Sequence, residues 1–127
     1  MSSIDGDRVR RAIDAAERET TGRIGVRIAH GPVRDPFEQA RRQFLHAGLH
    51  RHAHRNAVVF LVAPKARRFA VYGDEAIHDR VGDEFWASLV RDMTPLFANG
   101  DITAGLELGI ARVGERFRAH FPKDARA

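Results

Sequence analysis

The sequence predicts an α/β fold, a three-layer α/β/α sandwich on a small mixed β-sheet. Three observations lead to this prediction. The continuously apolar stretch Ala57–Ala63 is typical of a central strand that is covered on both faces. An alternating strand over residues 23–29 precedes it, with a helical segment between them, which is a right-handed βαβ crossover with parallel strands. Arg68–Gly73 follows after the short turn 64–67, and it pairs with the central strand as an antiparallel hairpin.

Helices are expected before and between the strands. The first covers residues 4–20 and ends at Gly22, which we expect to be a left-handed cap. The second begins with Asp35 as N-cap and Pro36 at its first position, and it reaches about Leu49. Its predicted core stripe, at helical spacing, consists of Phe37, Ala40, Phe44 and Ala47.

Helices also follow the hairpin. Asp74 caps a short helix over residues 75–80, and a longer helix covers residues 83–97, which Pro95 is expected to kink or shorten. The inner face of the longer helix is predicted to carry Phe85, Trp86, Leu89, Val90 and Met93. The core positions of the last helix are Leu106, Ile110, Val113 and Phe117. A GxxxG motif that starts at Gly105 predicts close packing of this last helix on a neighbouring helix.

Length and composition indicate a globular protein. The 127 residues suit one domain over the whole chain, with residues 1–4 and 123–127 as frayed ends. The absence of cysteine excludes disulfides and thiolate chemistry. The start of the chain has no apolar core of a signal peptide, and the most apolar stretch is too short to cross a bilayer. We therefore expect a soluble, cytoplasmic protein.

The net charge of +4 raises the question of nucleic-acid binding. Nearly all the positive charge is arginine, spread along the chain and interleaved with acidic residues, as in RETTGR and KDAR. A phosphate-binding surface needs its cations clustered on one face. The charge pattern therefore gives no strong nucleic-acid signal, although an acidic partner bound through arginine stays open as an alternative.

The hairpin brings polar residues together at one rim of the sheet. Pairing Ala57 with Gly73 places Arg55 beside Asp74, where an ion pair is one interpretation. The rim residues predicted to gather there are His52, His54, Arg55, Asn56, Asp74, Glu75, His78, Asp79 and Asp83. Calcium prefers six to eight oxygen ligands, and the carboxylates of Asp74, Glu75, Asp79 and Asp83 are the candidates for such a site. The alternative is that Asp74 and Asp83 are helix caps and Asp79 is solvated.

Four histidines lie within nine residues: His46, His50, His52 and His54. His46 falls opposite the apolar stripe of its helix, so we expect it in solvent. His50 is expected at the end of that helix, where a protonated imidazole favours the helix dipole. The last two lie in the lead-in to the central strand. Zinc needs about three ligands that converge, and these four start from three directions, which argues against a zinc site.

Five segments, in order, resemble the TPM domain family: AERETTGRIGVRI (residues 16–28), RNAVVFLVA (55–63), RFAVYGDEAIHDRVGDEFW (68–86), MTPLFANGDITAGLELGIARVGE (93–115) and HFP (120–122). The GD…VG..FW…FP pattern is most similar to the short stand-alone bacterial branch. The resemblance implies an α/β/α sandwich. It also implies two activities known in the family: one plant member is described as an acid phosphatase, and some members bind calcium or another divalent ion through acidic loops.

In the family that this chain resembles, many members are exported or membrane-anchored. Several bacterial members are thought to lack phosphatase activity and to serve membrane-associated processes. This chain departs from the broader pattern, because the sequence shows no N-terminal D..GLL segment and we expect neither a signal peptide nor a trailing membrane helix. We therefore favour a non-catalytic interaction or regulatory domain with an unknown protein partner, modulated by calcium. A metal-dependent phosphatase is the alternative, with rim carboxylates holding the ion and Arg55 the phosphate.

Overall fold

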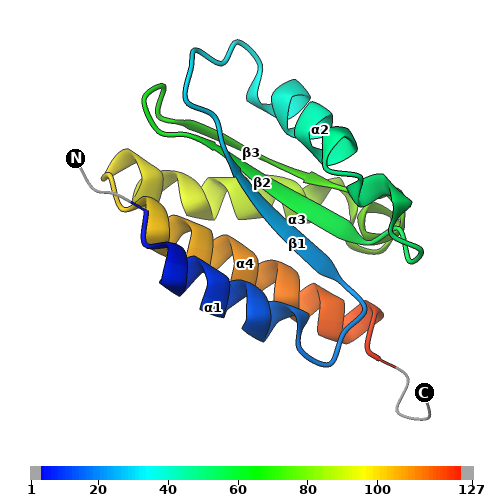
Figure 1. Cartoon of the computed structure of the whole chain (residues 1–127). Coiled ribbons are helices and arrows are strands. Elements are labelled where there is room, and N and C mark those ends of the chain that lie inside the picture. Colours follow the sequence, from blue (N-terminus) through cyan, green and yellow to red (C-terminus); the bar gives the residue numbers. More distant parts are fainter. Residues whose placement is uncertain (1–3, 124–127) are drawn as a thin grey trace.

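The computed structural model describes residues 4–123 and has the predicted α/β/α architecture (Figure 1). Its elements, in chain order, are α1 (Gly6–Glu17), β1 (Arg23–Ile28), α2 (Pro36–His46), the 3₁₀ turn η1 (Leu49–Arg51), β2 (Ala57–Ala63), β3 (Arg68–Gly73), α3 (Glu75–Ala98) and α4 (Ile102–His120). The strand order in the sheet is β1-β2-β3. β2 is central, parallel to β1 and antiparallel to β3, as predicted.

The three layers are unequal. Helix α2 alone covers one face of the sheet, where it contacts β2 and β3, and helices α1, α3 and α4 lie on the other face (Figure 1). The helix α2 starts where Asp35 caps it, since the Asp35 carboxylate accepts the N–H of Glu38 at 3.1 Å, as the sequence predicted.

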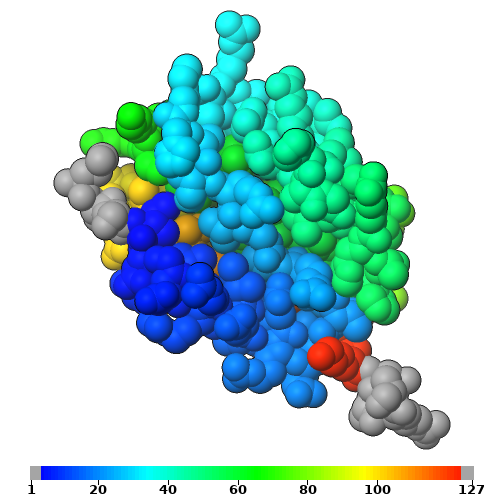
Figure 2. All heavy atoms as spheres, viewed as in Figure 1, coloured from blue at the N-terminus to red at the C-terminus, as the bar shows by residue number. Residues whose placement is uncertain are grey.

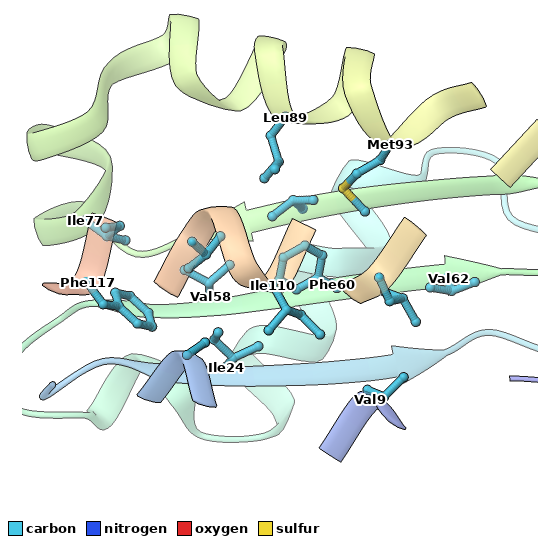
Figure 3. Packing of buried hydrophobic residues seen from close by; sticks show 14 of the residues in the cluster. Val9, Ile24, Val58, Phe60, Val62, Ile77, Leu89, Met93, Ile110 and Phe117 are labelled. Atoms are coloured by element: carbon cyan, nitrogen blue, oxygen red, sulfur yellow. The ribbon is translucent and has the colours of Figure 1, made fainter. Parts of the chain in front are cut away.

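Every residue of β2 is buried, and alternate side chains enter two separate cores. Val58, Phe60 and Val62 pack into the larger core with α1, α3 and α4 (Figure 3). The odd-numbered residues point the other way, and Val59 is among those that pack against α2. The larger core also holds Leu89, Met93, Ile110 and Phe117, which come from the helices (Figure 3). The fold therefore depends on a strand that needs cover on both sides.

Glycines let α4 approach its neighbours closely. A side chain at Gly105 would overlap the ring of Phe97, and one at Gly109 would lie 2.7 Å from the sulfur of Met93, both on α3. A Cβ at Gly114 would lie 2.8 Å from the backbone Cα of Ala16 on α1. These contacts confirm the predicted close packing through the GxxxG motif and extend it to α1.

The end of α1 differs from the prediction. Gly22 does not take a left-handed conformation; the positive φ of 63° falls on Glu19 instead. Gly22 is needed for space, because a Cβ there would overlap the ring of Phe117. Helix α2 ends at His46 rather than Leu49, since Gly48, at φ 75°, turns the chain into η1.

Three predicted core side chains lie near the surface. Phe37 is 54% exposed and Val90 38% exposed, and Ala47 is also exposed. Because α2 reaches over the outer strand β3, its first turn lies at the sheet edge, where the ring of Phe37 lies 5.5 Å from the ring of Tyr72. The stripe therefore predicted which way α2 faces but not how far the sheet extends beneath it.

Helix α3 breaks at Gly82, whose φ and ψ of 75° and 172° are not helical, so the predicted boundary between two helices is confirmed. Pro95 was predicted to kink or shorten this helix. That prediction is wrong, because α3 continues past Pro95 to Ala98 and Gly82 is its one non-helical residue.

Two residues of the predicted frayed ends, Ile4 and Lys123, lie within the described part of the chain. Ile4 packs against the larger core, and the N–H of Lys123 donates to the carbonyl of Glu19 at 2.9 Å. The last described residues therefore lie against the end of α1 (Figure 2). Residues 1–3 and 124–127 lie outside the described residues. Within residues 4–123 no helix is both long and apolar enough to cross a lipid bilayer.

We predict that Gly114→Ala destabilises the protein by about 1–2 kcal/mol. The added methyl group meets the backbone of Ala16, which cannot move aside as a side chain can. Gly6→Ala is the matched control, because nothing lies within 4 Å of its Cβ position in the first turn of α1. Urea denaturation of both variants checks this; equal stability of the two would contradict the close contact between α1 and α4.

Candidate functional site

The predicted ion pair between Arg55 and Asp74 is present at the rim and is bidentate. The Nε of Arg55 donates to Oδ2 of Asp74 at 2.7 Å, and Nη2 donates to Oδ1 at 2.9 Å. Oδ1 also accepts the backbone N–H of Glu75 at 2.7 Å, which caps α3. The Asp74 side chain is only 6% exposed. Both of its oxygens are therefore already hydrogen-bonded to the protein.

Backbone contacts hold this pair in place. The N–H of Asp74 donates to the carbonyl of Ala57, and the carbonyl of Arg55 accepts the N–H of Ala76 in the first turn of α3, both at 3.0 Å. Arg55 itself has a φ of 52°, in the left-handed region that non-glycine residues rarely occupy. The strand register confirms that Arg55 lies near Asp74. It is shifted by one residue from the predicted register, because Val58 rather than Ala57 lies opposite Gly73.

The carboxylates beside Arg55 act on its charge. The hydrogen bond to Asp74, together with the charges of Asp74 and Glu75, raises the pKa of the Arg55 guanidinium above its ordinary value. Glu75 contributes an oxygen 3.3 Å from Nη1. The guanidinium is thus held charged, and its donors are largely directed at two carboxylates of the protein itself.

A cleft of about 480 Å³ opens beside the pair, between α2, β3 and the start of α3. Three aromatic side chains line it, Phe37 from α2, Tyr72 from β3 and Trp86 from α3, and we call this hollow the aromatic cleft. Its polar wall consists of Arg55, Asp74, Glu75, His78 and Asp83. Rim residues therefore do line a cavity, in combination with aromatic residues that the sequence assigned to the core or to a strand.

Trp86 is half-buried and packs against the larger core, as the sequence predicted, but it also lines the aromatic cleft. Its indole N–H donates to Nδ1 of His78 at 3.1 Å, and Nε2 of His78 lies 3.4 Å from a carboxylate oxygen of Asp83. Gly73 permits this position, because a Cβ there would lie 2.6 Å from the indole ring. A tryptophan eight residues after a histidine gave no sequence signal of this contact, because the contact depends on the break of α3 at Gly82.

Two of the other predicted rim residues lie at a separate hollow of about 270 Å³. His52 and His54 line it, and Nε2 of His52 lies 2.8 Å from the carbonyl of Thr21. The buried Asn56 donates from Nδ2 to the hydroxyl of Thr21 at 3.0 Å, which ties β2 to the start of β1. His46 is exposed, as predicted, whereas His50 lies in η1 rather than at the end of α2.

The four predicted metal ligands differ in their surroundings. Asp74 is fully used by its donors, Glu75 faces Arg55, Asp79 is exposed, and Asp83 is 98% exposed beside His78. Among residues 4–123, no three histidine or acidic side chains are grouped so that they hold an ion. Calcium binding through these residues stays a prediction.

The domain is thus an α/β/α sandwich on a three-stranded mixed sheet, with an arginine–aspartate pair at its rim. A profile of the TPM domain matches residues 1–116, and the chain belongs to the TPM domain family. A comparison with curated proteins returns no match.

Solved structures support the same fold. The chain is similar to the BA42 protein of the psychrophilic bacterium Bizionia argentinensis, with 27% sequence identity and a TM-score of 0.83 over 98% of this chain and 88% of that one. The N-terminal domain of the cg2496 protein from Corynebacterium glutamicum is 17% identical, with a TM-score of 0.70 over 92% and 74% of the two chains. An N-terminal domain from P. gingivalis is 12% identical, with a TM-score of 0.76 over 91% and 77%.

We predict that Asp74→Ala destabilises the protein by about 2 kcal/mol or more. The change removes a helix cap and leaves the donors of Arg55 and Glu75 without a partner. Asp35→Ala is the matched control, because Asp35 caps α2 without an arginine on its carboxylate, and it should cost about 1 kcal/mol. A double-mutant cycle with Arg55→Ala, measured by urea denaturation, should give a stabilising coupling. Additive effects would contradict the pair.

Proposed function

We propose that this TPM domain is a non-catalytic protein-interaction domain, and that the aromatic cleft is its contact surface. The observation that carries the proposal is the bidentate pair at the rim. Arg55 and Asp74 are the residues that phosphatase chemistry at this rim would require, and each is the main partner of the other. The surface that remains available beside the pair is the aromatic cleft.

The Arg55–Asp74 pair disfavours both steps that a phosphatase would need, which are binding the phosphate and holding the metal ion. Binding a phosphate through Arg55 means separating its guanidinium from a carboxylate that is 6% exposed, which leaves that carboxylate buried and unpaired. Holding an ion through Asp74 means withdrawing its oxygens from Arg55 and from the cap of α3. Each step therefore begins by breaking contacts that stabilise the fold.

The aromatic residues favour protein contact. Phe37 is the most exposed large apolar side chain among residues 4–123, and it lies in the same hollow as Tyr72 and Trp86. Aromatic and arginine side chains are enriched in protein interfaces, and apolar residues grouped at one place mark such surfaces. Residence in the cytoplasm and a membrane-associated partner stay predictions from the sequence.

A photo-crosslinking amino acid placed at Phe37 should give discrete protein adducts in the cells that naturally make the chain. The same probe at Leu45 is the matched control, because Leu45 is also on α2 and 42% exposed but does not line the aromatic cleft. We expect adducts at position 37 that Trp86→Ala weakens, and none of the same size at position 45.

Two results would contradict this proposal. Equal adducts at both positions would mean that the aromatic cleft has no special role. Hydrolysis of a chromogenic phosphate ester in the presence of calcium, magnesium or zinc, lost on Asp79→Asn and Asp83→Asn, would show a phosphatase instead.

Modulation by a divalent ion is the second part of the proposal. Glu75, Asp79 and Asp83 are exposed and lie in the first turns of α3, and Glu75 and Asp83 line the aromatic cleft. Because these side chains face solvent, they can turn toward a common ion at little cost to packing, unlike Asp74. A few carboxylates completed by water give weak sites, with dissociation constants near the millimolar range.

Calcium should therefore raise the melting temperature modestly. At about 10 mM calcium a site with a Kd of about 1 mM adds about 1.4 kcal/mol, or about 5 °C for a chain of this length. Asp79→Asn with Asp83→Asn should abolish the shift, whereas Asp7→Asn with Asp14→Asn, two exposed acids on α1, should keep it. No shift for the wild-type protein at this concentration would overturn calcium binding.

A further inference from the structure

The two edges of the sheet are protected differently. The edge strand β1 carries Arg27 within its pairing with β2 and Gly25 near its middle. The edge strand β3 has no charge and no proline from Phe69 to Gly73, and its register with β2 is unbroken by a bulge. Proteins usually guard an exposed edge with one of these devices, since its free N–H and C=O groups pair readily with another strand. The outer edge of β3 is therefore open to pairing.

An apolar surface runs along this edge. A shallow hollow of about 630 Å³ lies beside β3, between the start of α2 and the middle of α3. Phe37 lines it from α2, and Trp86, Ala87 and Val90 line it from α3. Phe37 and Val90 are two of the three exposed large hydrophobic residues within the described part of the chain. We call the outer edge of β3 with these four side chains the β3 face.

The charges at the two ends of the β3 face have opposite sign. On α3, Asp83 precedes Ala87 by four residues, and Arg91 follows it by four. At the ends of the strand, Arg68 begins β3 and Glu75 follows it. If a second copy approaches with its β3 antiparallel, each basic end meets the acidic end of the other copy.

Three of these four charged residues, Asp83, Arg91 and Arg68, are available to a partner, whereas Glu75 faces Arg55. Asp83 is 98% exposed, and Arg91 is 74% exposed and only 3.8 Å from the neighbouring Asp92. The guanidinium of Arg68 donates to the carbonyls of Val33 and Arg34 rather than to a carboxylate. The β3 face is thus self-complementary in charge, a property that a two-fold axis requires and that an unrelated extended peptide has no need of.

We propose that two copies of this chain associate through the β3 face, with antiparallel pairing of β3 and a two-fold axis that passes near Val71 and Ala87. The two sheets join into one of six strands, and α3 packs on α3 with Asp83 of each copy beside Arg91 of the other. This inference rests on the proposed function, because it names a second copy as the partner of a surface that shares Phe37 and Trp86 with the aromatic cleft.

Sedimentation and light scattering of the purified chain test the pairing. At about 200 µM the wild-type protein should be a dimer. Arg91→Glu and Asp83→Arg should each be monomeric, because each variant places like charges together at two symmetric positions. Mixing the two variants should restore a dimer, since every contact then has opposite charges, and so should the double variant Asp83→Arg/Arg91→Glu. Arg11→Glu, an equal charge change on the exposed face of α1, should stay dimeric.

Each contrary outcome overturns the inference. A wild-type chain that stays monomeric at this concentration rules out self-pairing, and a dimer that survives both single variants places the contact elsewhere. Circular dichroism of every variant confirms folding, and restoration in the mixture excludes misfolding as the cause of dissociation. A monomer whose Phe37 probe still captures a different protein would overturn self-pairing but leave the proposed function standing.

Discussion

The rest of this structure depends on the burial of β2 on both faces. Even-numbered side chains of the strand enter one core and odd-numbered ones enter the other, so helices are required above and below it. The chain just before β2 must also be held in place by polar contacts. Asn56 holds it by bonding Thr21, and Arg55 holds it by bonding Asp74 and by accepting the N–H of Ala76. The polar rim is therefore the closure of an apolar strand, which explains why its strongest contacts are internal.

Sequence reasoning succeeded where the signal is local. An uninterrupted run of apolar residues needs two covered faces, and a short turn after it leaves little choice but a hairpin. The Arg55–Asp74 pair followed from hairpin geometry, and a register error of one residue did not matter because the arginine side chain is long. The role of Gly22 was predicted wrongly. This glycine leaves room for the ring of Phe117, a residue nearly a hundred positions away, and does not form a left-handed cap.

The candidate site was predicted only in part, for a related reason. Helical spacing tells which side of a helix faces a sheet but not where the sheet ends, so Phe37 and Val90 were assigned to a core that stops short of them. Likewise, the spacing of carboxylates along α3 says nothing of their partners. Arg55 and His78 draw Glu75 and Asp83 in different directions. Side-chain partners across elements decide a site, and one sequence shows them poorly.

The thin layer formed by α2 has a consequence for how the molecule opens. Only Ala40 and Phe44 of this helix are buried, whereas α4 contributes eight buried residues to the opposite layer. Local opening requires least free energy where the fewest apolar contacts are lost, so α2 should detach before global unfolding. Its departure uncovers Val59 and Leu61 within a strand of high β-propensity, the kind of segment that seeds aggregation when exposed. The helix that contributes least to the core is thus the one that covers the most aggregation-prone strand.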